Sequence, residues 1–309
     1  MPLHPLFASR LSIFEDETLS FEEQLAAFNA PLSEYASPEV ETIDLEIVGG
    51  EHKIPARLYW PKNNEPNLPG LVWFHGGGFT EGGLWQNESD VVSRELAHRA
   101  NLIVLAVDYR LCNNGILFPA PQEDGVSSLQ WMAKNAEKLG IDKSRIFIGG
   151  ISAGGALAAS VTVQDRDSGN NFLAGALLNC PILHHKLPEL SEELQGKLQE
   201  IHGFGLTSEY VDKRNEYLCG GNTAGSPKWW FAGEVEDLKG LAPIQIINCE
   251  YDALRASGER FAKQLSAAGA ELEVLFEPGT PHAHINRFPQ DCPPMDRTLN
   301  SMVGFIQNH

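Results

Sequence analysis

Short apolar runs alternate with longer segments of helical spacing along most of the chain. Residues 40–47 and 54–59 alternate apolar and polar side chains as strands do, and Gly49-Gly50 between them indicates a hairpin. Six further strands are expected from the runs at 71–74, 102–107, 146–148, 172–180, 244–249 and 272–276. Because most of these runs are apolar throughout, both faces of the sheet must be covered, as in parallel sheets flanked by helices. The pattern predicts an α/β protein with an eight-stranded, mostly parallel, doubly wound sheet.

Segments with helical spacing lie between these strands. They are expected at 89–100, 121–139, 153–163, 255–268 and 297–307. Two stretches break the alternation: residues 1–38, which hold one expected helix around 21–28, and residues 184–230, which are rich in Glu, Lys and Gly and contain no convincing strand. Long irregular segments in compact domains are usually functional and commonly lie over the ligand crevice. We therefore expect lids; the alternative is two surface decorations without a function.

The composition is that of an ordinary folded chain. The 309 residues are 42% hydrophobic and 21% charged, which excludes wholesale disorder, collagen-like repeats and coiled coil. The chain carries 23 Lys+Arg against 41 Asp+Glu, a net charge of −18. Such a surface repels phosphate groups, so we expect neither a nucleic acid nor an anionic membrane as partner.

The cysteines are odd in number and scattered: Cys112, Cys180, Cys219, Cys249 and Cys292. They form no CxxC pair, so we expect neither a metal site nor a disulfide framework. The N-terminus has no basic segment followed by an apolar stretch, and no apolar stretch is long enough to span a bilayer. The expectation is a cytoplasmic protein with reduced thiols.

The sequence GISAGG at residues 150–155 follows an expected strand and precedes an expected helix. A serine in such a sharp turn is exposed above the sheet, and glycines two residues before and after it avoid collisions across the turn. The start of the following helix favours negative charge there. We interpret Ser152 as a nucleophile; the alternative is a plain helix N-cap in a glycine-rich turn.

A second glycine-rich segment, HGGG at residues 75–78, follows the strand at 71–74. Consecutive glycines leave main-chain N–H groups able to point at one spot and to stabilise the oxyanion that forms when serine attacks a carbonyl. The expected donors are Gly77 and Gly78, with the N–H of Ala153 as the third. His75 precedes the nucleophile in the chain, so we expect it to orient the loop. The alternative is a flexible or phosphate-binding loop, but no Lys-Ser/Thr follows as in a P-loop.

The acid and the base should follow Ser152 in the chain, in that order. Asp252 lies just past the strand at 244–249 and is favoured over its rival Glu250, which lies nearer the strand body. The base is expected in the loop after the last strand, where both His282 and His284 are candidates.

Taken together, these motifs resemble the hormone-sensitive-lipase branch of the α/β-hydrolase fold, the bacterial "family IV" esterases. The resemblance covers the chain from about residue 40 to its end. The motifs that carry it are HGGG at 75–78, DYRL at 108–111, FPA at 118–120 with Asp124, GISAGG at 150–155, and the DxLxxxG pattern of Asp252, Leu254 and Gly258. The family's histidine follows PGxx, which implies His282 as the base. Departures are Ile151, Cys112 to Gly115, and His284 where the family usually has an aromatic residue.

The resemblance also implies an organisation of the chain. Residues 1–38 and 184–222 match the two parts of the family's helical cap, and residues 39–183 and 223–309 match its catalytic domain. His75, Phe79, Trp85 and Phe204 are candidates for substrate contacts. A homodimer is a family-level expectation, and no cofactor is needed.

The resemblance implies a serine carboxylesterase acting on small, short-chain or aryl esters. The same residues would serve a lactonase or a formamidase. A third hypothesis is a non-catalytic small-ligand receptor on the same fold, but such receptors have lost the catalytic histidine.

Overall fold

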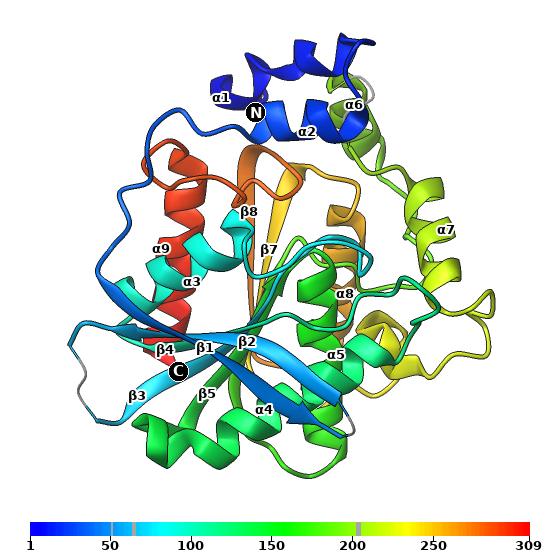
Figure 1. The fold of residues 1–309 in the computed structure, drawn as a ribbon. Coiled ribbons are helices and arrows are strands. Elements are labelled where there is room, and N and C mark those ends of the chain that lie inside the picture. The colour runs from blue at the N-terminus through cyan, green and yellow to red at the C-terminus, as the bar shows by residue number, and fades with distance from the viewer. Residues whose placement is uncertain (51, 64–65, 202–204) are drawn as a thin grey trace.

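The computed structural model contains one eight-stranded sheet and describes the chain apart from residues 51, 64–65 and 202–204. The strands are β1 (Val40–Gly49), β2 (His52–Pro61), β3 (Leu68–Phe74), β4 (Ile103–Val107), β5 (Ile141–Ile151), β6 (Leu173–Asn179), β7 (Ile244–Tyr251) and β8 (Leu272–Pro281). Their spatial order is β1-β2-β4-β3-β5-β6-β7-β8 (Figure 1). The predicted α/β-hydrolase fold with its eight-stranded sheet is confirmed.

The pairing explains the two kinds of apolar pattern. β1 pairs with β2 and β2 with β4 in antiparallel fashion, whereas the five remaining pairs are parallel. β3, β4 and β7 are buried along their whole length. β1 lies at the sheet edge and keeps exposed positions, as expected for a strand with one solvated face.

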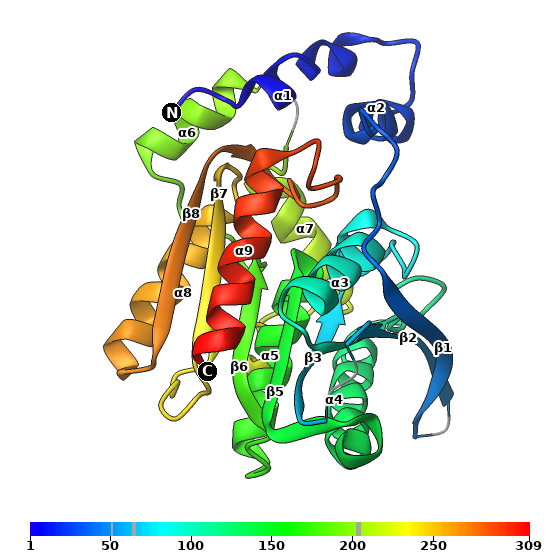
Figure 2. The ribbon, with the colours of Figure 1, turned by 90° about the vertical axis from the view of Figure 1, so that its left-hand side faces the viewer.

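Helices cover both faces of the sheet (Figure 2). One face carries α3 (Asn87–Arg99) and α9 (Pro293–Asn308), which contribute Leu96 and Leu299 to its core. The other face is covered by α4 (Ala120–Leu139), α5 (Ala153–Asp167) and α8 (Arg255–Ala268). Most of these helices lie at or within a few residues of their predicted positions, because their apolar spacing marks the buried face.

The remaining helices belong to the two segments that interrupt the sheet pattern. The first contains α1 (Pro5–Ala8), η1 (Leu11–Glu15) and α2 (Phe21–Asn29), and the second contains α6 (Glu192–Glu200) and α7 (Ser208–Leu218). Two short turns, η2 (Lys228–Trp230) and η3 (Ala232–Glu234), lead back to the sheet. The N-terminal helices and α6 lie at the same end of the molecule (Figure 1). In Figure 2, α1 and α6 lie above β7 and β8, whereas α2 lies above α3.

Ionic contacts join these segments to the end of β7. The N-terminal ammonium of Met1 lies 2.5 Å from Glu250 Oε1, and Lys197 Nζ of α6 lies 3.4 Å from the same oxygen. Lys197 also donates to the carbonyl oxygen of Met1. Both chain segments are therefore attached at the carboxyl edge of the sheet, where parallel α/β sheets place their ligand crevice. Among the described residues, no helix is long and apolar enough to cross a membrane.

Candidate active site

Ser152 occupies a strained turn between β5 and α5. Its backbone has φ 56° and ψ −115°, which few residues other than glycine adopt. A Cβ on Gly150 would lie 2.4 Å from the carbonyl carbon of Gly154, and one on Gly154 would lie 2.2 Å from the carbonyl oxygen of Phe74. Both positions therefore require glycine for steric reasons, and the turn presents the hydroxyl of Ser152 at the start of α5.

The Ser152 hydroxyl, the His282 imidazole and the Asp252 carboxylate form a continuous hydrogen-bonded series. Ser152 Oγ lies 3.0 Å from His282 Nε2, and His282 Nδ1 lies 2.6 Å from Asp252 Oδ2. Asp252 follows β7 directly and His282 follows β8, so adjacent parallel strands bring the two together. Asp252 Oδ1 also accepts the N–H of Leu254 at 3.0 Å, which fixes the carboxylate.

The environment of His282 favours its protonated form. Burial acts to lower the pKa of this imidazole, but the charge of Asp252 and the hydrogen bond to it outweigh burial and raise the pKa above its ordinary value of 6.5. A base held in this way accepts a proton from the serine more readily. The carboxylate therefore both orients the ring and stabilises the imidazolium that forms during proton transfer.

The two rivals for these positions have other contacts. Glu250 accepts the N–H of Gly279 at 2.6 Å and pairs with the N-terminal ammonium, so it ties the N-terminal segment to the sheet. His284 is buried, with Nδ1 3.2 Å from Cys249 Sγ and Nε2 2.8 Å from Thr298 Oγ1. Both ring nitrogens of His284 are occupied away from Ser152.

The loop after β3 presents unused N–H groups. Gly77 and Gly78 adopt φ values of 100° and 59°, and a Cβ on Gly77 would lie 2.0 Å from the carbonyl oxygen of Glu81. The N–H groups of Gly77, Gly78 and Ala153 donate to no acceptor among the described residues. Main-chain donors left open beside a nucleophile are what an oxyanion requires.

His75 supports this loop and is itself held neutral. Burial lowers the pKa of His75 to about 4. Its Nδ1–H donates to the carbonyl oxygen of Gly76 at 2.7 Å, and its ring stacks on Tyr109 with centroids 4.3 Å apart. Tyr109 in turn donates its hydroxyl to the carbonyl oxygen of His75 at 2.8 Å. These contacts agree with the expected orienting role rather than a direct substrate contact.

Glu88, near the start of α3, is a part of this site that sequence reasoning missed. Its side chain is buried, and Oε1 accepts the N–H of Gly76 at 2.6 Å. Burial raises the pKa of this carboxyl to about 7, although the Gly76 N–H and the charge of His282 act in the opposite direction. No motif marked this glutamate; the only signal was an acidic residue on a helix face that otherwise contacts the core.

The candidates for substrate contacts are placed differently from one another. Phe79 is buried in the core, where its ring meets Phe118 edge-on with centroids 4.9 Å apart. Trp85 is 77% exposed. Phe204 lies outside the described residues. The structure therefore brings together the residues expected to react, whereas Phe79 packs in the core and Trp85 is largely exposed.

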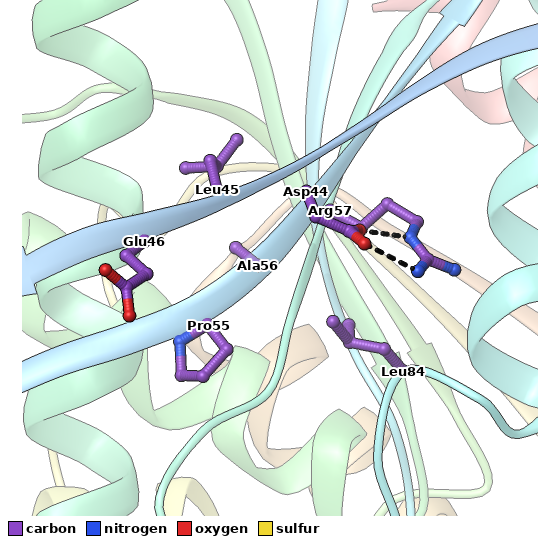
Figure 3. A pocket seen from close by; sticks show the side chains of 7 residues that line it. All are labelled: Asp44, Leu45, Glu46, Pro55, Ala56, Arg57 and Leu84. Carbon is purple, nitrogen blue, oxygen red and sulfur yellow. Dashed lines mark hydrogen bonds and ion pairs between the residues drawn. The ribbon is translucent and has the colours of Figure 1, made fainter.

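The cavities near the surface of the described residues include two of similar size. One, of about 340 Å³, lies against the β1–β2 hairpin and is lined by Asp44, Arg57 and Leu84 among others (Figure 3). Arg57 donates to both carboxylate oxygens of Asp44 there, so these two charged groups of the cavity are already paired. The second, of about 370 Å³, lies between α7 and the loops after β3 and β4.

Among the described residues, three potential metal ligands come together at one place. One ligand atom each from Cys180, Asp252 and His282 lies within 4.8 Å of the other two. Asp252 and His282 also belong to the hydrogen-bonded series that ends at Ser152. A metal there would compete with the hydrogen bond that holds the imidazole, so the geometry fits proton transfer better than metal ligation.

Known proteins share this architecture. A family model described as the α/β-hydrolase fold matches residues 71–286. The carboxylesterase NlhH of Mycobacterium tuberculosis is 35% identical over 257 residues, which cover 81% of this chain and 77% of the relative. The arylesterase of Saccharolobus solfataricus is 29% identical over 320 residues, covering 99% of this chain and 98% of the relative. The chain belongs to the α/β-hydrolase family.

Solved structures agree with this assignment. A hyperthermophilic esterase from Pyrobaculum calidifontis superposes with a TM-score of 0.85 at 30% identity, covering 100% of this chain and 99% of that chain. The resemblance to the hormone-sensitive-lipase branch is confirmed, and the chain is a carboxylic-ester hydrolase.

Proposed function

We propose that this hydrolase is a serine carboxylesterase that cleaves small, short-chain or aryl esters through an acyl-enzyme. The observation that carries the proposal is the series from Ser152 Oγ through His282 to Asp252, with distances of 3.0 and 2.6 Å. The carboxylesterase and arylesterase relatives support this class of substrate. A small-molecule ester is accordingly the proposed partner.

The reaction follows from the geometry. His282 Nε2 takes the proton of Ser152 as its oxygen attacks the ester carbonyl, and the carbonyl oxygen becomes an oxyanion. The N–H groups of Gly77, Gly78 and Ala153 are the proposed donors to that oxyanion, each worth about 3 kcal/mol of barrier. The His282 imidazolium then protonates the leaving alcohol, and a water molecule, activated by the same imidazole, releases the acyl group.

Residues 1–38 and 184–222 are the proposed cap above this site. Their helices lie at the carboxyl edge of the sheet, and the contacts of Met1 and Lys197 with Glu250 hold the two parts against β7. We also propose a cytoplasmic location, supported by the five free cysteines. The homodimer stays a prediction that light scattering on the purified protein tests.

The nucleophile is tested with Ser152→Ala and p-nitrophenyl butyrate. The variant should keep its circular dichroism spectrum and lose about 10⁶-fold in kcat, because the bond-forming oxygen is gone. Ser266→Ala is the matched control, since this serine is exposed on α8. An organophosphate should label the peptide that contains residue 152 in the parent protein and not in the variant. Undiminished turnover by Ser152→Ala would refute the assignment.

The alternative activities are tested separately. A panel of esters, lactones and N-formyl compounds separates an esterase from a lactonase or a formamidase, which would use the same residues. Complete lack of turnover on every compound, with the fold intact, would instead favour the receptor hypothesis.

A further inference from the structure

The cap helix α7 presents a polar and aromatic face to the loop after β3 that contains Gly77 and Gly78, the oxyanion loop. Tyr210, Arg214 and Tyr217 are spaced four and three residues apart, which places them on one side of the helix. They line the cavity of about 370 Å³, whose other wall includes Thr80 and Asn113 from the loops after β3 and β4. Both tyrosine side chains are about half exposed, so their rings are accessible from the cavity side.

Arg214 carries a charge that no carboxylate among the described residues neutralises. Among the described residues it has no ion pair; its Nη1 donates to Thr80 Oγ1 and its Nη2 donates to Tyr210 Oη. A guanidinium has five N–H donors, so most of them stay available for an acceptor. The neighbouring Lys213 also lines the cavity, but its ammonium lies 2.7 Å from Glu209 Oε1 and its side chain is 73% exposed.

This guanidinium lies directly beside a proposed oxyanion donor. A Cβ built on Gly78 would be 3.4 Å from Arg214 Nη1 and 3.6 Å from its Cζ. A group bound to Arg214 would therefore be held close to the ester carbonyl, within the reach of a short substrate. The two hydrogen bonds to Thr80 and Tyr210 fix the guanidinium in that position.

We propose that the cavity between α7 and the oxyanion loop is a substrate subsite for a carboxylate, with Arg214 as its anchor. The inference rests on the proposed esterase function and narrows its substrates to esters that bear an additional carboxylate near the scissile bond. The overall charge of −18 disfavours anions at long range, so a carboxylate substrate needs a local cation of this kind. A guanidinium also binds a carboxylate through two parallel hydrogen bonds, which adds orientation to attraction.

The carboxylate can belong to either half of the ester, and two substrate pairs separate these sources. On the acid side, p-nitrophenyl hemiglutarate is compared with the p-nitrophenyl ester of monomethyl glutarate. On the alcohol side, 4-acetoxybenzoate is compared with 4-acetoxybenzamide, which carries the same aromatic ring. In each pair the scissile ester is the same and the neutral member lacks the carboxylate, so the ratio of kcat/KM for the anionic ester to that for the neutral ester reports the subsite.

The parent protein and Arg214→Met are assayed on both pairs. In one pair the ratio should fall about tenfold to hundredfold in the variant, mainly through KM of the anionic ester, because a charge-assisted hydrogen bond is lost. Arg214→Lys should restore part of the ratio, because it keeps the charge but not the bidentate geometry. Lys134→Met on α4 is the matched control, and its ratio should change less than twofold, since this exposed side chain does not line the cavity.

A second measurement compares the salt dependence of the two proteins. Raising the salt concentration from 0.05 to about 0.5 M screens the overall charge of −18 in both proteins, but it weakens the attraction to Arg214 only in the parent. The ratio should therefore fall more, or rise less, in the parent protein than in Arg214→Met. A ratio that is equal in the parent protein and Arg214→Met for both pairs would overturn the subsite, as would the same salt dependence of the ratio in both proteins. Normal turnover of neutral esters in that case would leave the esterase function standing, whereas no turnover of any ester would refute the function itself.

Discussion

Glu88 provides a test of how the buried part of the site is organised. Its carboxyl accepts the N–H of Gly76 at 2.6 Å and is buried beneath the oxyanion loop. Burial raises its pKa from 4.5 to about 7. Between these two pH values the folded protein keeps a proton that the unfolded chain has released, so the stability present at low pH is lost as the pH rises through this window.

The magnitude follows from the size of the shift. Each pKa unit corresponds to 1.36 kcal/mol, so ionising this side chain in the folded state costs about 3 kcal/mol between pH 4.5 and pH values above 7. Glu88→Gln has the same shape and keeps an oxygen for the Gly76 N–H, but it does not ionise. The free energy of unfolding of the variant, relative to the parent, should therefore rise by about 3 kcal/mol across this window.

Urea denaturation followed by tryptophan fluorescence at several pH values from 4.5 to 8 measures this difference. Glu137→Gln on α4 is the matched control, because that side chain is exposed and should give a nearly constant difference. If the free energy of unfolding of Glu88→Gln relative to the parent stays constant with pH, or falls as the pH rises, the assignment of a buried, largely protonated carboxyl at this position is refuted.

Three further outcomes are expected at the reacting groups. Asp252→Asn should lower kcat by about 10⁴-fold with an unchanged circular dichroism spectrum, because the amide no longer holds the correct imidazole tautomer; a loss below tenfold would contradict this role. His282→Ala should lose several orders of magnitude in kcat and His284→Ala far less, and the reverse ranking would move the base to His284. The kcat/KM for p-nitrophenyl butyrate should fall on acidification with a midpoint above pH 6.5, because Asp252 raises the pKa of His282. A kcat/KM that does not change down to pH 4 would exclude a titrating base.

The sheet and its flanking helices could be predicted because their signals are local. The apolar runs that become β3, β4 and β7 are buried throughout, and the helix predicted at 255–268 is observed at the same residues. By contrast, the short helices α6 and α7 lie in a stretch where only the absence of strands could be recognised. Their helical patterns are short and polar, so packing against the rest of the protein rather than local pattern decides their existence.

The order of the reacting groups along the chain could be predicted from the sequence, but their contacts could not. Chain order pointed to Ser152 and Asp252, whereas His282 and His284 could be separated only through the family resemblance. In the structure Ala283 between them has φ 56°, a turn that sends the two rings to different partners. A residue in this left-handed conformation leaves no mark in the sequence when it is not glycine or asparagine.

The strands, the elbow, the glycine loop and the family to which they belong could therefore be predicted from local patterns in the chain. The tertiary structure alone decided that Glu88 of α3 holds the oxyanion loop and that Arg214 of α7 lies beside Gly78. The physical reason is distance along the chain. Periodicity and turn chemistry act over a few neighbouring residues, whereas the burial of a carboxylate or the isolation of a guanidinium depends on segments that meet only after folding.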